Sequence, residues 1–203
     1  MITLYKYTHP SRAETVLWAL KELGLDYEIK ALDAKKNEQR NPEFLAINPY
    51  GKIPAITHNG QHFTESLAII EYLNDLHPDK PLTPNIDNVN YAEQNYKLRK
   101  VISFGMIEIE SYLWILTKIK VLRNFENWSE GTAENCIASI NKALPIACDW
   151  LEGQNYIAGE SFTLADIYYH HLFSWLKMLG IRLPETVMAY LKRLSARESF
   201  PKG

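Results

Sequence analysis

The chain has few cysteines and no long apolar run. Cys136 and Cys148 are its only cysteines, and in the helix expected there they would lie about 18 Å apart, which excludes a disulfide between them. Two unpaired thiols fit a reducing compartment, so we expect a cytoplasmic protein. No apolar stretch approaches the roughly 20 residues of a membrane span, and no basic head precedes an apolar run at the amino terminus. We therefore expect neither a membrane span nor a secretory signal.

Charge of either sign is not in excess. The 22 Lys and Arg residues nearly balance 24 Asp and Glu residues, which leaves a net charge of −2. We therefore expect neither nucleic acid nor an anionic membrane as a partner. Six histidines include the adjacent pair His170 and His171, but no cysteine lies near them, so no metal site is expected. The hydrophobic content of 46% is instead typical of a globular protein with a sizeable core.

The first 77 residues alternate between strand-like and helix-like patterns. The expected strands and helices, in chain order, are strand 2–7, helix 11–23, strand 26–32, a helical turn at 42–47, strands 53–57 and 62–63, and helix 66–76. This order predicts a small α/β domain over residues 1–77, with a sheet that is partly parallel and partly antiparallel.

A proline-rich stretch with little apolar periodicity follows at residues 78–90, and it predicts a linker. From residue 91 onward the periodicity is helical, which predicts an all-helical domain over residues 91–203. Its expected helices are 91–122, 130–151 (with a kink at Pro145), 163–179 and 184–196.

Hydroxyl residues lie at the start of two expected helices. Ser11 with Glu14, and Thr163 with Asp166, fit the capping box, in which a hydroxyl and a carboxylate three residues later satisfy each other's backbone amides. Thr8 differs, because it follows the first strand and precedes the helix. A hydroxyl there lies where open α/β sheets bind ligands, although a β-branched residue that merely ends a strand is the alternative.

A second group of candidates lies between residues 53 and 66. Pro54 follows Ile53 within an apparent strand, where proline marks an edge or a special turn, often with a cis bond. Glu65 and Ser66 open an apolar helix. Ser66 is either a further helix cap or, together with the helix amides and dipole, a site for a carboxylate.

Together these motifs resemble the cytosolic glutathione transferase family over nearly the whole chain. The landmarks are Asn48-Pro49, Lys52-Ile53-Pro54, residues 65–73 and residues 162–167. The resemblance implies a thioredoxin-like α/β domain with a cis-proline, followed by an all-helical domain. It also implies a cytoplasmic homodimeric enzyme that uses glutathione as co-substrate and needs no other cofactor and no metal.

The resemblance further implies roles for single residues. The segment from Thr8 to Ala13 looks like that of bacterial-type, theta-like members, in which a serine at the Thr8 position stabilises the glutathione thiolate; threonine keeps the hydroxyl. Ser11 is the second candidate catalytic hydroxyl. The candidates for binding glutathione are Gln39, Lys52, Ile53, Pro54, Glu65 and Ser66. Candidates for the wall of an electrophile pocket, or else plain core residues, are Tyr96, Phe104, Ile107 and Trp114.

The implied activity is conjugation of glutathione to a hydrophobic electrophile, as in detoxification. One alternative is a nu-type disulfide-bond reductase or peroxidase, which also uses a threonine, although proline and asparagine follow it where this chain has His9 and Pro10. The other alternative is a non-catalytic module that binds glutathione or another ligand. The sequence does not name the electrophile.

Overall fold

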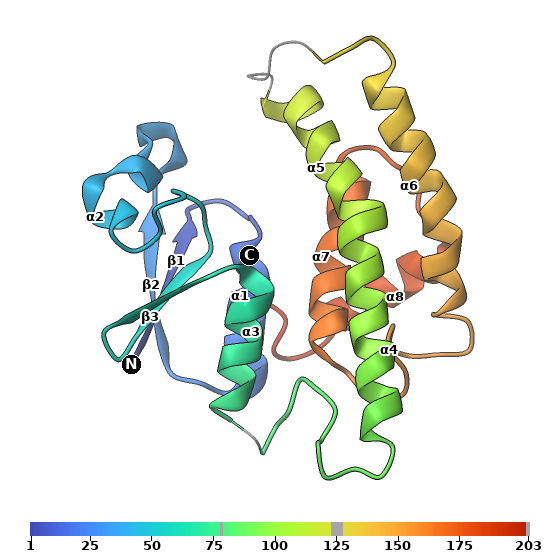
Figure 1. Ribbon diagram of the computed structural model, residues 1–203, viewed down its shortest axis with the longest axis horizontal. Coiled ribbons are helices and arrows are strands. Elements are labelled where there is room, and N and C mark those ends of the chain that lie inside the picture. Colours follow the sequence, from blue (N-terminus) through green and yellow to red (C-terminus); the bar gives the residue numbers. More distant parts are fainter. Residues whose placement is uncertain (78, 123–127, 202–203) are drawn as a thin grey trace. The chain divides into compact units, whose positions relative to one another are not determined.

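The computed structural model describes residues 1–77, 79–122 and 128–201, which divide into two compact units (Figure 1). Unit 1 comprises Met1–Thr83 together with the residues from Arg197 onward, and unit 2 comprises Pro84–Ala196. The sequence pattern instead assigned the end of the chain to the helical domain. Pro78, the first residue of the expected linker, lies outside the described residues.

Unit 1 is built on a four-stranded sheet with the order β2-β1-β3-β4. Strand β1 (Ile2–Tyr7) runs parallel to β2 (Tyr27–Leu32) and antiparallel to β3 (Ala55–His58). Strand β3 pairs antiparallel with β4 (Gln61–Thr64) through a turn at Asn59 and Gly60. The predicted mixed sheet is therefore confirmed.

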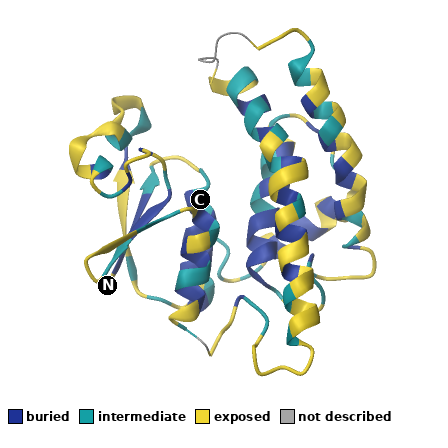
Figure 2. Ribbon diagram, in the orientation of Figure 1, coloured by how far each residue is buried: buried dark blue, intermediate teal, exposed yellow. Residues whose placement is uncertain are grey.

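Helices lie on both faces of this sheet. Helices α1 (Ala13–Leu23) and α3 (Ser66–Asp75) pack against each other, and Figure 2 shows the buried residues along them in dark blue. Lys6 of β1 reaches Glu14 of α1, whereas the neighbouring Tyr5 packs on Phe44 of the short α2 (Pro42–Leu45) at a ring distance of 5.6 Å. Because successive strand residues point to opposite faces, α1 and α2 cover opposite faces.

The start of α1 departs from the predicted capping box. The N-cap is Arg12, which makes no side-chain cap, and the Ser11 Oγ accepts only a long hydrogen bond, 3.3 Å, from the Ala13 N–H. The Glu14 carboxylate lies 2.8 Å from the Lys6 Nζ. The prediction was wrong because the adjacent strand supplies a charged partner that binds Glu14 in place of the Ser11 amide.

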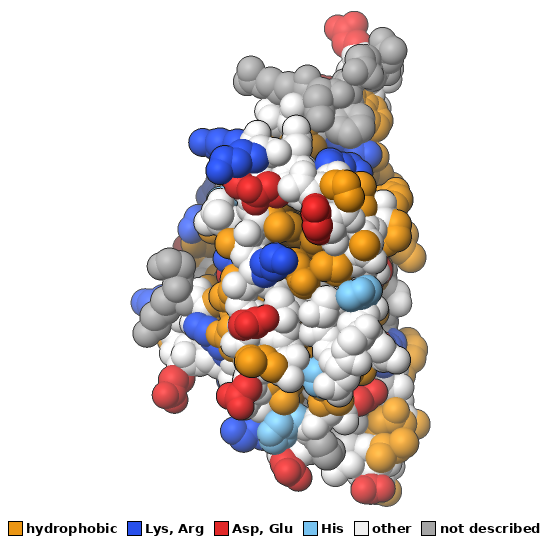
Figure 3. All heavy atoms as spheres, turned by 90° about the vertical axis from the view of Figure 1, so that its left-hand side faces the viewer, with side chains coloured by type: hydrophobic (Ala, Val, Ile, Leu, Met, Phe, Trp, Pro, Cys, Tyr) orange, Lys and Arg blue, Asp and Glu red, His pale blue; other side chains and the backbone are white. Residues whose placement is uncertain are grey.

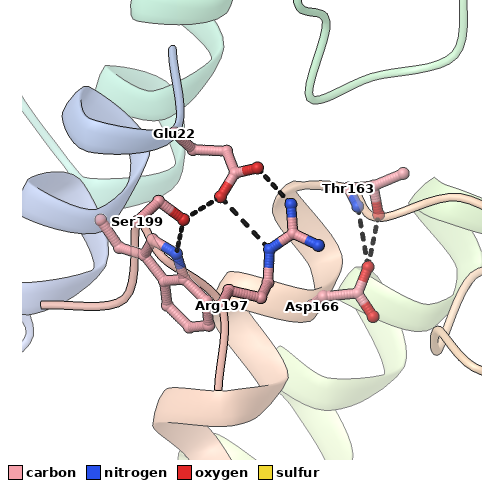
Figure 4. Close-up of polar contacts among 6 residues, drawn as sticks. Glu22, Thr163, Asp166, Arg197 and Ser199 are labelled. Carbon is pink, nitrogen blue, oxygen red and sulfur yellow. Dashed lines mark hydrogen bonds and ion pairs between the residues drawn. The ribbon is translucent and has the colours of Figure 1, made fainter. Parts of the chain in front are cut away.

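The last described residues, which follow unit 2 in sequence, pack on α1. Glu22 forms an ion pair with Arg197 and accepts a hydrogen bond from the Ser199 hydroxyl (Figure 4). The Trp18 indole N–H donates to the Ser199 Oγ at 3.1 Å, and Phe200 meets the Trp18 ring edge-on at 5.0 Å. These residues thus complete unit 1 from the far end of the chain.

Unit 2 is helical throughout its regular structure among the described residues. Its helices are α4 (Tyr91–Phe104), α5 (Ser111–Thr117), α6 (Thr132–Asp149), α7 (Leu164–Met178) and α8 (Glu185–Ser195). The long helix predicted over 91–122 is continuous, but two stretches of it, Gly105–Glu110 and Lys118–Leu122, are π-helical. Within the ranges described, no helix combines the length and apolarity needed to cross a membrane.

The capping box predicted at the start of α7 is confirmed. The Asp166 carboxylate accepts a hydrogen bond from the Thr163 N–H at 2.8 Å (Figure 4). It also accepts from the Ile157 N–H at 2.9 Å and from the Tyr190 hydroxyl at 2.8 Å. Burial raises the pKa of Asp166, and these donors act in the opposite direction. The box thereby joins the turn before α7 to α8.

Gly105 allows α4 and α7 to approach closely. A Cβ atom there would lie 2.7 Å from the Tyr168 ring and 3.0 Å from the Tyr169 hydroxyl oxygen, so no side chain fits. The same Tyr169 hydroxyl donates to the Val101 carbonyl at 2.7 Å. A glycine at the first residue of the π-helical stretch is therefore required by packing.

Candidate functional site

Strand register brings three of the predicted site segments to one edge of the sheet in unit 1. Tyr5 of β1 pairs with Ala55 of β3, and Ala55 in turn pairs with Thr64 of β4. Pro54 and Glu65 are the residues immediately beyond these pairs, on the side where β1 ends. The end of β1, the start of β3 and the start of α3 therefore meet at this edge.

Thr8 lies at this edge and is exposed. Its N–H donates to the Leu32 carbonyl at 3.3 Å, which places it beside the last residue of β2. The carboxyl ends of adjacent parallel strands form the crevice in which open α/β sheets bind ligands. The position of Thr8 is thus the one expected of a ligand-facing hydroxyl, whereas the Ser11 hydroxyl already binds the backbone of α1.

A cis peptide bond joins Ile53 to Pro54, as predicted. Pro54 is buried, and the Ile53 side chain packs against a small core cluster of Tyr5, Leu32 and Phe44. The anchored side chain fixes the Ile53 backbone at the same edge of the sheet, directly after Lys52.

The start of α3 has the features of an anion site. Ser66, the first residue of the helix, is 8% exposed, and the N–H groups of a first helical turn have no partner within the helix. Glu65, the residue before it, has φ +67°, a backbone conformation that residues other than glycine rarely adopt. Such strain is concentrated at functional sites, because the surrounding structure must maintain it.

The loop from Asn48 to Lys52 is held from both sides. The buried Asn48 side chain accepts a hydrogen bond from the Tyr50 N–H at 3.1 Å and donates to the Lys52 carbonyl at 2.6 Å. Arg40 donates from Nη1 to the Tyr50 carbonyl at 3.2 Å. A Cβ at Gly51, whose φ is +59°, would lie 2.7 Å from the Arg40 Nη1. The same Cβ would lie 2.9 Å from the backbone Gln39 carbonyl oxygen, so this contact and the positive φ favour glycine at this position.

Positive charge lies on and beside this loop. The Lys52 Nζ lies 4.5 Å from the centre of the Tyr50 ring. Burial raises the pKa of the Tyr7 hydroxyl, while the nearby Arg40 guanidinium lowers it. Tyr7, Arg40 and Tyr50 were not among the predicted site residues. Tyr7 could have been chosen as the last residue of its strand, but the sequence carried no signal for the placement of Arg40.

Gln39 lies in the 3-10 turn Glu38–Arg40, next to Arg40. Its Nε2 donates to the Asn37 Oδ1 at 3.4 Å, and its Oε1 is buried without a hydrogen-bond partner among the residues that the structure describes. A buried acceptor of this kind is costly unless a ligand or water satisfies it.

A hollow of about 270 Å³ lies between β2 and α2, lined in part by Lys30, Glu43 and Ile47. It contains none of the predicted site residues, so it is not the site described above.

On the face shown in Figure 3, Lys and Arg side chains are interspersed with Asp and Glu side chains. Within the described part of the chain, no three His, Cys, Asp or Glu side chains gather as a metal site would require.

The four candidates for the electrophile wall lie in unit 2 and have two kinds of surroundings. Phe104 and Trp114 pack edge-on against tryptophan rings of the same unit, at ring distances of 5.0 and 6.1 Å. Tyr96 and Ile107 are each 64% exposed. The wall remains a prediction, and Tyr96 and Ile107 are the members with most surface to offer a ligand.

The sequence matches two family descriptions. Residues 1–75 match "Glutathione S-transferase, N-terminal domain", and residues 105–198 match "Glutathione S-transferase, C-terminal domain". Glutathione S-transferase D7 of Drosophila melanogaster is 30% identical over 168 residues, which cover 82% of this chain and 70% of the relative. A probable maleylacetoacetate isomerase of Caenorhabditis elegans is 33% identical over 168 residues, covering 81% and 73%.

Solved structures agree with these matches. A glutathione transferase from Methylococcus capsulatus superposes with a TM-score of 0.80 at 26% identity, covering 98% of this chain and 95% of the other. A glutathione transferase from Phanerochaete chrysosporium, solved with oxidized glutathione, gives 0.81 at 25% identity, covering 98% and 92%. The sheet-based unit, the helical unit and both sequence matches lead to one conclusion: the chain belongs to the glutathione S-transferase family and has its fold.

Proposed function

We propose that this glutathione transferase conjugates the glutathione thiolate to an electrophilic small molecule at the edge of the unit 1 sheet. The observation that carries the proposal is the convergence there of Thr8, the cis Ile53–Pro54 bond and the strained start of α3. Glutathione has a carboxylate at each end and an ammonium at one. Cations at Arg40 and Lys52 and the helix start at Ser66 complement those two ends.

Each segment of this edge has a task in the proposed site. The Ile53 backbone amide and carbonyl bind the cysteinyl part of glutathione, next to Pro54. The α3 amides and the Ser66 hydroxyl bind the γ-glutamyl carboxylate, and Glu65 binds the ammonium beside it. Lys52 and Gln39 bind the glycine carboxylate.

Thr8 is the proposed donor to the sulfur, in the theta-like manner but with threonine in place of serine. A free thiol with a pKa of about 8.5 is only a few per cent thiolate at pH 7. A hydroxyl donor favours the anion, so lowering the pKa by about one to two units raises that fraction several-fold or more. The thiolate then forms a C–S bond with the electrophilic carbon, and the leaving group departs with its bonding electrons.

A panel of acceptors tests this activity against its alternatives. We expect conjugation of chlorinated aromatics or epoxides to be the fastest reaction with glutathione, in keeping with a role in detoxification. Fastest turnover of 2-hydroxyethyl disulfide would assign a disulfide-bond reductase, a reaction with which the threonine at position 8 is compatible. Fastest turnover of hydroperoxides would assign a peroxidase. Binding of glutathione without turnover of any acceptor would leave a non-catalytic module.

We propose a homodimer in solution. The resemblance to the family supports it, and Tyr96, Met106 and Ile107, on α4 and the π-helical stretch that follows it, are 64%, 49% and 64% exposed and offer apolar surface to a partner. Light scattering at micromolar concentration should give about twice the chain mass of 23.5 kDa. A value equal to the chain mass would exclude the dimer.

We place the enzyme in the cytoplasm. Cys136 and Cys148, both in α6, are free thiols, and burial raises the pKa of each. Thiols that are mostly protonated react slowly, and a reducing compartment preserves both them and the thiol form of glutathione.

A further inference from the structure

We propose that Tyr50 is a positioning residue that places the Lys52 ammonium for the glycine carboxylate of glutathione. Tyr50 thereby contributes to the selection of ligands that carry a carboxylate at that end. The inference rests on the proposed glutathione site and adds a residue that the resemblance to the family does not assign.

Both polar groups of the Tyr50 backbone are hydrogen-bonded to side chains of other residues. Its N–H donates to the Asn48 Oδ1 at 3.1 Å, and its carbonyl accepts from the Arg40 Nη1 at 3.2 Å. At the next residue, Gly51, a Cβ would lie 2.9 Å from the backbone Gln39 carbonyl oxygen. Arg40 and Asn48 thus fix the backbone position from which the Tyr50 side chain extends.

The ring itself is not part of the core. Tyr50 is 68% exposed, so its position is not explained by burial of apolar surface. It lies instead under the Lys52 ammonium, at 4.5 Å from Nζ to the ring centre, well within the roughly 6 Å over which a cation is attracted to an aromatic face. Asn48 holds the Lys52 carbonyl at 2.6 Å, so both ends of the lysine residue are restrained.

Restraint of this lysine matters because its side chain is long and rich in rotamers. A flexible lysine loses much conformational freedom when it holds a ligand, and a group that already occupies its bound position loses less. An ammonium has three N–H donors, so it can lie against a ring and also donate to a carboxylate. The Tyr50 ring should therefore strengthen the binding of glutathione, and it should do so only through its effect on Lys52.

Titration calorimetry with two ligands tests this assignment. The probes are glutathione and γ-glutamylcysteine, which ends in its cysteine carboxylate and has no carboxylate at the glycine position. We expect Tyr50→Ala to weaken glutathione binding about two- to fivefold, equivalent to the roughly 0.5–1 kcal/mol of an exposed cation–π contact. Tyr50→Phe should bind normally because the aromatic face remains. Binding of γ-glutamylcysteine should not change, and in a Lys52→Ala background Tyr50→Ala should have no further effect.

A matched control is available in the same unit. The Lys30 Nζ lies 5.6 Å from the centre of the Tyr5 ring, outside the proposed site, so Lys30→Ala removes a lysine of the same kind and should leave glutathione binding unchanged. In steady-state kinetics, the Tyr50→Ala effect should appear in the KM for glutathione and not in kcat.

Two results would overturn the assignment of Tyr50. An equal loss with γ-glutamylcysteine, or in the Lys52→Ala background, would show that Tyr50 acts through the loop and not through Lys52. Tighter glutathione binding by Tyr50→Ala would show that the ring withholds the ammonium from the ligand. If glutathione does not bind at the proposed site at all, the result is different, because Ser66→Ala and Lys52→Ala would then both bind glutathione normally.

Discussion

Replacement of Ser66 by alanine is expected to weaken glutathione binding by about 5- to 150-fold. The Ser66 side chain is buried at the first position of α3, where its hydroxyl can donate to the γ-glutamyl carboxylate. Loss of the hydrogen bond to an ionised acceptor that binding has removed from water costs about 1–3 kcal/mol, which corresponds to that loss of affinity. Titration calorimetry measures the change directly, with thermal melting to confirm that the variant is folded.

Thr132→Ala is a matched control for this variant. Thr132 is the first residue of α6 in unit 2, so the control removes a hydroxyl from an equivalent helix position that is not part of the unit 1 site. Its loss should leave glutathione affinity unchanged. If folded Ser66→Ala binds glutathione as tightly as the parent protein, then the peptide does not lie at the start of α3 and the proposed site is wrong.

Thr8→Ala is expected to raise the pKa of bound glutathione by about one unit. A hydroxyl that contributes about 1.4 kcal/mol to the thiolate lowers its pKa by that amount, and removal of the donor reverses the effect. Less thiolate is then present at pH 7, so conjugation slows by up to about tenfold at that pH and recovers as the pH rises. Thiolate absorbance and conjugation rate, each followed against pH, measure the shift. Thr8→Ser should keep most activity because the donor remains.

Ser11→Ala separates the two candidate hydroxyls. The Ser11 Oγ accepts a hydrogen bond from the Ala13 N–H, so its loss should cost up to about 1 kcal/mol of stability and little activity. Thr8 binds neighbouring backbone through its own N–H, which alanine retains, so Thr8→Ala should melt normally. If Ser11→Ala shifts the thiolate pKa and Thr8→Ala does not, the assignment is reversed. If neither shifts it, backbone amides and the helix dipole stabilise the thiolate.

The sequence predicted those parts of the fold that are specified by residues close together along the chain. The β-rich composition of residues 2–7 located β1, and the strand-like residues on both sides of Asn59-Gly60, a dipeptide typical of tight turns, located the hairpin of β3 and β4. Thr163 and Asp166 lie three residues apart, so their capping box was readable. The same pattern misled at Ser11, because the partner that binds Glu14 is Lys6 on the adjacent strand, and only the packed structure shows that competition.

The parts of the candidate site that were missed depend on contacts between separate segments. Arg40 reaches Tyr50 from a 3-10 turn whose path no periodicity describes. The strain at Glu65 likewise has no sequence signal, because a glutamate before a helix usually has ordinary backbone angles. Motifs could therefore name Lys52 and Ser66, whereas the arrangement that places them required the fold.

The contacts of Glu22 and Trp18 with Arg197 and Ser199 have a consequence for biosynthesis. About 175 residues separate these partners, and the ribosome makes the chain from its amino terminus. While unit 2 is being translated, the nascent α1 carries a carboxylate and an indole whose partners do not yet exist. Unit 1, although encoded first, therefore completes its structure only after Arg197 and Ser199 have left the exit tunnel.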